Sequence, residues 1–434
     1  MSSRRDSGVN RRTFMASAGA GAAALAVHGR SSRAAGPNDR IRLAVIGING
    51  RGVAHIDAFA QRKDVDLATL CDIDTRLFDL RVKHALLRSG RTPATVQDLR
   101  RVFDDKNIDA VSIATPNHWH ALAAVWACQA GKDVYVEKPV SHTFIEGRKI
   151  VEAARKYGRI VQAGTQNRSI SGVIEAVAQL RAGVIGEIYM AKGLCYKPRG
   201  SIGHKPDGKA PAGVDYNIWL GPAAERPFNP NRFHYEWHWN WDYGNGDLGN
   251  QGIHQMDVAR WGLGKDEWPT KIESSGGRYG YSDDGQTPNT QMCTFKYDNC
   301  LLQFEVRGLP TNADAGIKIG NIFYGSKGYM TVNGSSWATF LGHKSEPGPS
   351  GRENSGDHFG NFIAAVKSRK QEDLHADILE CHRSSALCHL GNIAYQTGRA
   401  LEFDPKAETF GNDQAANALL SRDYRAPFTM PESV

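Results

Sequence analysis

The stretch Ile-Arg-Leu-Ala-Val-Ile-Gly-Ile-Asn-Gly-Arg-Gly, residues 41–52, decides the fold that we expect. Residues 43–46 form a short apolar run, which is typical of a strand buried on both faces. Glycines follow at 47, 50 and 52, and residues 53–62 then carry apolar side chains at helical spacing. A strand, a glycine-rich turn and a helix direct free backbone N–H groups and a positive helix end at a phosphate. The stretch therefore predicts a nucleotide-binding turn.

The glycine pattern of this turn matches the dinucleotide-binding fingerprint in part. That fingerprint has glycine at three positions, which here hold Gly47, Asn49 and Gly52. Asn49 departs from the pattern, although asparagine is one of the few other residues that tolerate a positive φ. The alternative interpretation is a purely structural turn between a strand and a helix.

An acidic residue after the next apolar run favours dinucleotide binding. Residues 65–71 read as a second buried strand, and Asp72 follows it 25 positions after Gly47. A carboxylate roughly 20 residues beyond the first glycine binds the ribose hydroxyls of the adenosine half. Because an acid repels a 2′-phosphate, Asp72 favours NAD over NADP. Asp72 has an alternative role as a helix N-cap, which suits Asp74 better.

Strands and helices alternate along the first part of the chain, which predicts a doubly wound parallel sheet. The expected strands are 43–46, 65–71, 110–115, 133–137 and 160–163, and the expected helices are 53–62, 75–88, 96–106, 116–130 and 143–157. Thr143 and Glu146 have the spacing of a capping box at the start of the last helix. We therefore expect a Rossmann domain over residues 40–165.

The rest of the chain has a different pattern and predicts an α+β domain over residues 166–434. Residues 196–246 are rich in Gly, Pro and aromatic side chains, and a long insertion of this kind is usually functional. The other expected elements are helices at 170–182, 248–263, 357–368 and 378–398, and strands at 187–195, 270–281, 290–297, 300–307, 317–324, 328–333 and 336–341. We expect an open, mainly antiparallel sheet with helices on one face.

The N-terminal segment, residues 1–39, resembles a twin-arginine export signal followed by a linker. Arg11 and Arg12 precede Phe14 and an Ala/Gly-rich run to Val27. The alternative is a basic tail without a targeting role. An export signal predicts a periplasmic or otherwise exported protein, and the twin-arginine route carries proteins that are already folded.

Composition excludes several classes of function. The formal net charge is +7, but residues 1–40 contain seven Arg and two Asp, so the basic excess lies mostly there and indicates no nucleic-acid partner. The longest apolar run is short and Ala-rich, so we expect no stable membrane span. The seven cysteines are scattered without a Cys-x-x-Cys motif, which predicts neither a disulfide framework nor a metal site.

Two basic side chains are candidates for proton transfer. Lys138 follows the strand at 133–137, and a lysine at a strand end beside a cofactor can polarise a hydroxyl group or accept its proton. His254 lies in a predicted helix, and a histidine can take a hydroxyl proton while hydride leaves the same carbon. A solvated surface lysine and a buried structural histidine are the alternatives.

These motifs together resemble the glucose–fructose oxidoreductase / inositol dehydrogenase / rhizopine-catabolism (Gfo/Idh/MocA) family over nearly the whole chain. The motifs are the turn at 47–52, the segment Ala-Thr-Pro-Asn-His-Trp-His at 114–120, Glu137-Lys138-Pro139 and the Gly-x-His step that ends at His254. The resemblance implies NAD(P)-dependent oxidation or reduction of a sugar or cyclitol hydroxyl. It also implies a homo-oligomer, a dimer or tetramer, formed through the outer face of the antiparallel sheet.

The resemblance assigns catalytic roles to Lys138 and His254. The family's usual Asp, four residues before that histidine, is Asn250 here, and an amide accepts no proton at neutral pH. The expected cofactor-binding residues are Gly47, Asn49, Gly50, Arg51, Gly52, Asp72, Thr115, Pro116, Asn117, His120, Glu137, Lys138 and Gln166. The expected substrate-binding residues are Lys138, Arg168, Tyr196, Arg199, Trp239, Asn250 and His254. Tyr196 and Arg199, together with Lys197, follow a strand end and are weaker candidates.

The aromatic segment at 235–243 has two interpretations. It supplies five aromatic rings in nine residues, which can form a wall that stacks on sugar rings or an irregular core packed under a long loop.

Export and a nicotinamide cofactor together predict an enzyme that holds its NAD tightly, because free nucleotide is not expected outside the cytoplasm. We therefore expect an oxidoreductase acting on a hydroxyl of a sugar, glycoside or cyclitol. The alternative is an NAD-dependent glycosidase or lyase that acts by transient oxidation, elimination and re-reduction. A non-catalytic sensor that keeps the fold is a third possibility, which the Asn at position 250 favours.

Overall fold

The structure is a computed structural model that describes residues 40–434, and the predicted export signal at 1–39 lies outside the described residues. Its first sheet is wholly parallel, as the alternating pattern predicts. The strands, in sheet order, are β3 (Ala94–Val96), β2 (Val65–Cys71), β1 (Ile41–Ile46), β4 (Ala110–Ile113), β5 (Asp133–Val136) and β6 (Val161–Ala163). This order is that of a Rossmann fold.

Helices cover both faces of the first sheet because the side chains of β1 alternate between two apolar cores. Leu43 and Val45 pack toward α2 (Arg51–Ala60) and α3 (Phe78–Ser89). Ala44 and Ile46 belong to the opposite core. That core is completed by α4 (Leu99–Asp104), α5 (Asn117–Gln129) and α6 (Phe144–Lys156). Thr143 and Glu146 form the predicted capping box at the start of α6.

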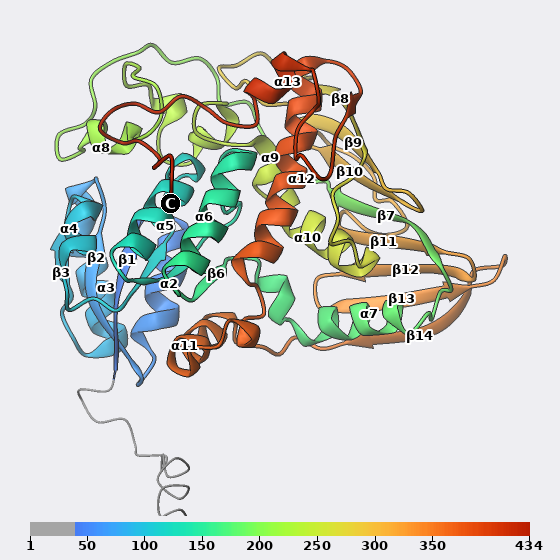
Figure 1. The fold of residues 1–434 in the computed structure, drawn as a ribbon, viewed down its shortest axis with the longest axis horizontal. Coiled ribbons are helices and arrows are strands. Elements are labelled where there is room, and N and C mark those ends of the chain that lie inside the picture. Colours follow the sequence, from blue (N-terminus) through green and yellow to red (C-terminus); the bar gives the residue numbers. More distant parts are fainter. Residues whose placement is uncertain (1–39) are drawn as a thin grey trace, which may run out of the picture. The chain divides into compact units, whose positions relative to one another are not determined.

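The second sheet is mainly antiparallel, as predicted, and its one parallel pair joins β7 and β10. In sheet order its strands are β14 (Glu346–Arg352), β13 (Ser336–Leu341), β12 (Gly328–Asn333), β11 (Ile319–Gly325), β7 (Ile188–Cys195), β10 (Leu301–Arg307), β9 (Thr290–Lys296), β8 (Lys271–Gly277) and β15 (Leu401–Glu402). One face is covered by α7 (Ser171–Arg181), α10 (Gly252–Leu263) and α12 (Ile378–Thr397). Figure 1 shows α12 passing beside both α6 and α10, so this helix connects the two halves.

The structure departs from the expected elements in several places, and the short strands β3 and β15 were not predicted. The segment predicted as a helix at 96–106 begins with the last residue of β3, and only α4 within it is helical. Strand β8 ends at Gly277 rather than at residue 281. Strand β14 was not predicted because its sequence, Glu-Pro-Gly-Pro-Ser-Gly-Arg, has no strand pattern; it lies at the sheet edge, where proline is tolerated. The helix predicted at 248–263 is divided into α9 (Gly246–Gly249) and α10.

The remaining helices lie in the long insertion and near the end of the chain. They are α8 (Tyr216–Leu220), α11 (His358–Ser368) and α13 (Gln414–Ala418), with short 3-10 turns at Thr75–Leu77, Gln166–Ser169, Pro230–Arg232, Glu236–Trp239 and Gln371–Asp373. Helix α11 packs into the core of the first sheet, against the face that carries Leu43 and Val45. Phe428 lies in the opposite core of that sheet. Two segments from the second half of the sequence therefore complete the first.

All seven cysteines, at 71, 128, 195, 293, 300, 381 and 388, are buried free thiols. Within residues 40–434 no group of three or more His, Cys, Asp or Glu side chains could hold a metal ion. None of the helices described in 40–434 is both long and apolar enough to cross a membrane.

Candidate active site

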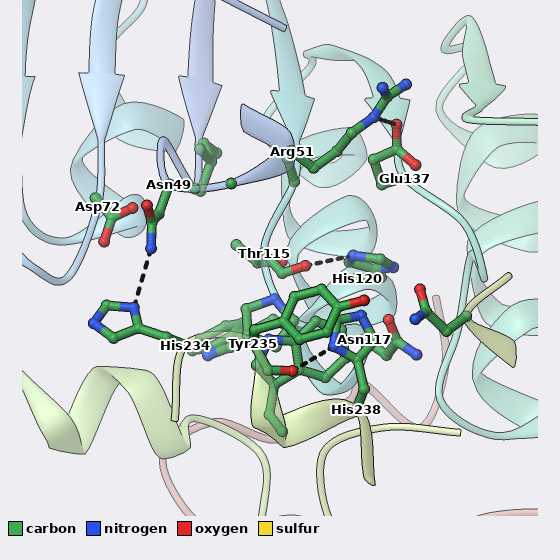
Figure 2. A pocket seen from close by; sticks show the side chains of 18 of the residues that line it. Asn49, Arg51, Asp72, Thr115, Asn117, His120, Glu137, His234, Tyr235 and His238 are labelled. Atoms are coloured by element: carbon green, nitrogen blue, oxygen red, sulfur yellow. Dashed lines mark hydrogen bonds and ion pairs between the residues drawn. The ribbon is translucent and has the colours of Figure 1, made fainter. Parts of the chain in front are cut away.

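A cavity of about 620 Å³ opens at the carboxyl ends of β1, β2, β4 and β5, between the first sheet and parts of the segment 219–254. This is the edge at which open parallel sheets bind their ligands, and its volume lies in the range of small-molecule sites. Figure 2 shows the side chains around it. The predicted site residues on its wall are Gly47, Asn49, Gly50, Arg51, Asp72, Thr115, Pro116, Asn117, His120, Glu137, Lys138, Gln166, Asn250 and His254.

The glycine turn needs glycine at two positions for close packing. A Cβ on Gly47, whose φ is +85°, would lie 2.7 Å from the carbonyl oxygen of Ala114. A Cβ on Gly52 would lie 1.9 Å from the carbonyl oxygen of Gly47, so Gly52 shapes the turn although it is not on the cavity wall. Open space surrounds Gly50, immediately before α2. The N–H groups of Gly52 and Val53 bond back to the carbonyl oxygens of Asn49 and Gly50, and the positive end of α2 suits an anion.

Asp72 holds the glycine turn and faces the cavity. Its Oδ2 accepts the N–H of Ile48 at 2.8 Å, and its Oδ1 accepts the N–H of Asp74 at 3.0 Å. Burial raises the pKa of Asp72 to about 6, and the backbone N–H groups oppose this rise. The carboxylate is thus charged at neutral pH. The capping role falls to Asp74, as the sequence indicated, because Asp74 accepts the N–H of Arg76.

Glu137 is the central acceptor at the middle of the cavity. Its Oε1 accepts hydrogen bonds from Arg51 Nε at 2.8 Å and Gln166 Nε2 at 3.1 Å, and Oε2 accepts the N–H of Lys138 at 3.1 Å. Burial alone would raise the pKa of Glu137, but the hydrogen bond to His55 and the charge of Arg51 hold it well below its usual value. A fixed carboxylate therefore positions the backbone of Lys138. Figure 2 shows the contact between Arg51 and Glu137.

His120 positions the chain rather than presenting a ring nitrogen to the cavity. Its Nδ1 lies 2.6 Å from the carbonyl oxygen of Pro139, and its Nε2 lies 2.8 Å from that of Thr115 (Figure 2). Asn117 likewise uses its amide within the protein, donating to Asn245 Oδ1 at 3.0 Å.

Lys138 and His254 line the same cavity, although they are distant in the sequence, and they are close enough for the charge of Lys138 to affect His254. Lys138 Nζ donates to the carbonyl oxygen of Asn250 at 2.7 Å and is 3.4 Å from its Oδ1. The break between α9 and α10 exposes this carbonyl, which would otherwise be bonded inside a continuous helix. Within the single helix predicted at 248–263, Asn250 instead ends α9 and His254 lies in the first turn of α10.

The two basic groups differ in charge. Burial lowers the pKa of Lys138 to about 8, so a substantial fraction of the amine is neutral in weakly alkaline solution. Burial and the neighbouring charge of Lys138 lower the pKa of His254 to about 3, which keeps its ring neutral. Its Nδ1 is buried and has no hydrogen-bond partner within residues 40–434, and the same is true of Thr115 Oγ1.

The second half of the chain covers the cavity with His234, Tyr235 and His238. His234, at φ +51°, places its Nδ1 3.1 Å from the amide Nδ2 of Asn49. Tyr235 and His238 belong to the aromatic segment that the sequence singled out, and His238 Nδ1 lies 2.5 Å from the carbonyl oxygen of Tyr235 (Figure 2). His234 was missed because it lies in a turn just before that segment. Trp237 packs in a small core with Trp219 and Phe233, as the core interpretation predicts, and all three line the cavity, whereas stacking on a sugar stays a prediction.

Four expected substrate contacts do not line the cavity. Arg168 is buried against Asp257, with Nε 2.8 Å from Oδ2. Tyr196 donates to Glu305 Oε2 at 2.7 Å. Arg199 is held by Asp247 at 2.6 Å, and Trp239 stacks beneath its guanidinium. Each of these side chains has a protein partner, and we correct their placement accordingly.

Of the three weaker candidates, Tyr196, Lys197 and Arg199, only Lys197 lines the cavity. Neighbouring side chains of an extended segment point to opposite sides, so Tyr196 and Lys197 cannot both face it. The alternating direction of side chains along the extended chain after β7 was the signal that could have distinguished Lys197 from Tyr196.

The residues present fit a bound dinucleotide. The open space at Gly50 and the N-terminus of α2 suit a pyrophosphate, and Asp72 suits ribose hydroxyls. The unpartnered Thr115 Oγ1 and His254 Nδ1 belong to residues of the same wall, where a ligand can supply partners.

Family profiles agree with this geometry. The Gfo/Idh/MocA NAD-binding Rossmann profile matches residues 41–165, and the profile of the family's C-terminal alpha/beta domain matches residues 198–430. The chain belongs to the Gfo/Idh/MocA oxidoreductase family. It is therefore an NAD-binding oxidoreductase-family protein, as its motifs predicted.

Curated relatives of this family member include glycosyl hydrolase family 109 protein 1 of Shewanella sp. (strain ANA-3), 29% identical over 152 residues. Another is alpha-N-acetylgalactosaminidase of Shewanella oneidensis, 32% identical over 120 residues. The matches cover 34% and 27% of this chain, and 33% and 26% of the relatives. The chain thus spans about a third or less of the length of these relatives.

Solved structures share the fold of this Gfo/Idh/MocA chain. The WlbA dehydrogenase from Bordetella pertussis, in complex with NADH and UDP-GlcNAcA, matches with a TM-score of 0.62 and 18% identity, covering 84% of this chain and 99% of that one. The aldose-aldose oxidoreductase from Caulobacter crescentus, complexed with glycerol, has a TM-score of 0.64 and 16% identity, covering 84% and 100%.

Proposed function

We propose that this protein is an NAD-dependent oxidoreductase that interconverts a hydroxyl and a carbonyl group on a sugar, glycoside or cyclitol. The observation that carries the proposal is that Lys138 and His254 line the same cavity as the glycine turn and Asp72. A dinucleotide held by the turn and Asp72 would share this cavity with both basic groups. The bound dinucleotide supplies the hydride acceptor or donor.

In the direction of oxidation, Lys138 Nζ accepts the hydroxyl proton. Its pKa of about 8 matches a general base for weakly alkaline solution. His254, with a pKa of about 3, is a poor proton acceptor and serves instead as a neutral hydrogen-bond partner that orients the hydroxyl. Asn250 holds the amine through its carbonyl oxygen, which explains how the site works without the family's usual acid.

A second candidate is an NAD-dependent glycosidase. The similarity to family 109 glycosyl hydrolases favours it, although that similarity covers about a third of this chain. Such an enzyme would return its cofactor to the starting oxidation state in each turnover and release an aglycone.

Export and assembly are further proposals. An exported enzyme must carry its NAD with it, so we propose that the twin-arginine segment delivers the folded protein with its nucleotide bound. We also propose a homo-oligomer through the outer face of the second sheet, as the family resemblance implies.

One experiment tests the function. The purified protein is denatured and the released nucleotide is identified by mass spectrometry, and the native protein is then screened against sugars and glycosides by nicotinamide absorbance. A ketosugar product supports the oxidoreductase. Free aglycone without net redox change supports the glycosidase, and a sample that neither contains nor binds nucleotide contradicts both.

A further inference from the structure

The substrate end of the cavity contains an ammonium group that has no acidic partner. Lys197 lines the cavity, and its Nζ is 3.4 Å from the amide oxygen of Gln251. Within residues 40–434, no carboxylate forms an ion pair with Lys197. Two other basic residues of the same stretch of chain do have acidic partners: Arg199 pairs with Asp247 at 2.6 Å, and Lys192 with Asp314 at 2.6 Å.

The groups near Lys197 do not compensate its charge. Its positive charge reaches Lys138, where repulsion helps to lower the pKa of that amine. Asn250 and Gln251 are neutral amides, and burial keeps the rings of His238 and His254 neutral. The nearest acid of the wall, Glu137, is occupied by Arg51 and by His55.

Lys197 has no acidic ion-pair partner in this partly buried site, and its charge acts against that of Lys138, on which the carboxylates of Glu137 and Asp247 act in the opposite sense. Like charges disfavour each other's ionised forms, and a positively lined cleft concentrates anions. A ligand anion would relieve the repulsion and would gain from a charge-assisted hydrogen bond.

We propose that the substrate is an anionic sugar derivative whose negative group binds Lys197 while its reacting hydroxyl lies at Lys138. This inference rests on the proposed oxidoreductase function and names its substrate class. A carboxylate of an acidic sugar and a phosphate ester of a sugar share the required chemistry. Lys197 thus acts as a specificity-determining residue, and Gln251 holds its amine toward the cavity.

The experiment compares charge-matched substrates on three proteins: the wild type, Lys197→Gln and the control Lys209→Gln, which removes the same charge at an exposed site off the cavity wall. Neutral hexoses, the matching uronates and the matching hexose 6-phosphates are assayed for kcat/KM and for equilibrium binding by calorimetry. If the enzyme prefers uronates, the negative group of its substrate is a carboxylate; if it prefers hexose 6-phosphates, that group is a phosphate ester.

We expect the wild type to prefer an anionic sugar over its neutral match by at least about tenfold. Lys197→Gln should lower kcat/KM for the anionic sugar by about 10- to 100-fold and for the neutral one by less than about threefold. Lys209→Gln should match the wild type. Lys197→Arg should keep most of the preference, because it keeps the charge.

Other results overturn the inference. Equal losses for neutral and anionic sugars, with an alkaline shift of the pH profile, would assign Lys197 to tuning Lys138 alone. Oxidation of neutral sugars without preference for anionic ones leaves the oxidoreductase and removes the inference. Binding of anionic sugars that depends on Lys197 but gives no redox change keeps the inference and removes the oxidoreductase, and a protein that neither binds nor oxidises any sugar contradicts both.

Discussion

The ring of His234 and the amide of Asn49 meet across the mouth of the cavity, with 3.1 Å between Nδ1 and Nδ2. His234 comes from the second half of the chain, and Asn49 occupies the middle position of the glycine turn. The contact therefore spans the place where the dinucleotide is expected to lie, and it would have to open for release.

Loss of this contact should speed nucleotide release. In the variant His234→Asn, asparagine tolerates the positive φ but is too short to reach Asn49. We expect this variant to raise the dissociation rate of NADH about fivefold, as the loss of one hydrogen bond implies. Stopped-flow displacement measures the rate. His204→Asn is the control, since His204 is exposed and bound to Asp284. An unchanged rate would show that the contact does not retain the nucleotide.

Removal of the Lys138 amine should abolish most of the chemistry. Lys138→Met should lower kcat/KM by about 10²- to 10⁴-fold, the contribution of a general base. Nucleotide binding, measured by fluorescence titration, should change little, because Arg51 still binds Glu137. If Lys138→Met keeps wild-type activity, the proposed proton acceptor is wrong.

The pH profile should report Lys138 and not His254. Since the neutral amine is the active form, kcat/KM for oxidation should rise with pH to a plateau, with a midpoint near 8. No inflection is expected near 6.5, because the pKa of His254 lies at about 3. An inflection near 6.5 that disappears in His254→Gln would instead make the histidine the base.

Cofactor choice should depend on the ionisation of Asp72. The carboxylate is charged above a pKa of about 6, so preference for NADH over NADPH should grow as pH rises from 5 to 8. Asp72→Asn should lose about tenfold of this preference at pH 8. The 2′-phosphate of NADPH also titrates near pH 6. The pH dependence of the cofactor preference that remains in Asp72→Asn therefore measures the contribution of this phosphate. Identical slopes in both proteins would mean that Asp72 does not contact this ribose.

Arg168 should matter for stability and not for substrate affinity. Arg168→Met leaves Asp257 buried without its cation, which should cost about 3–5 kcal/mol of unfolding free energy. Denaturant unfolding measures this loss, and KM of the folded enzyme should be unchanged. Arg168→Met combined with Asp257→Asn should be less destabilised than the sum of the single variants. A raised KM with normal stability would restore Arg168 to the substrate site.

Local pattern was enough to predict five of the six strands of the first sheet, its glycine turn and the capping box of α6, because each depends on neighbouring residues alone; the short edge strand β3, which is mostly exposed, was missed. The same pattern could not predict the break at Asn250. The apolar spacing continues from α9 into α10, so it gives no sign that the helix is interrupted. The chain packs closely at the interruption, where two glycines lie: a Cβ on Gly249 would lie 2.4 Å from the side chain of Asn245, and one on Gly252 would lie 2.9 Å from the carbonyl oxygen of Asp247.

The other wrong predictions concern site residues whose contacts are with residues distant in the sequence. Arg168 and Arg199 looked like free cations beside a site, but each meets a buried carboxylate that no local pattern reveals. Lys197 differs from them only because no such carboxylate lies near it within residues 40–434. His234 became part of the site because an irregular segment folds back over the turn at Asn49.

The packing of α11 against β1 has a practical consequence for dissecting the enzyme. Phe362 and Ile363 fill the same core as Leu43 and Val45, so a fragment that stops at residue 165 would present that sheet face to water. Such a fragment is expected to aggregate or to bind nucleotide poorly, and exchange of cofactor specificity between relatives by grafting whole domains would fail for the same reason. Redesign of this enzyme should therefore proceed by single substitutions at the turn and at Asp72, with α11 left in place.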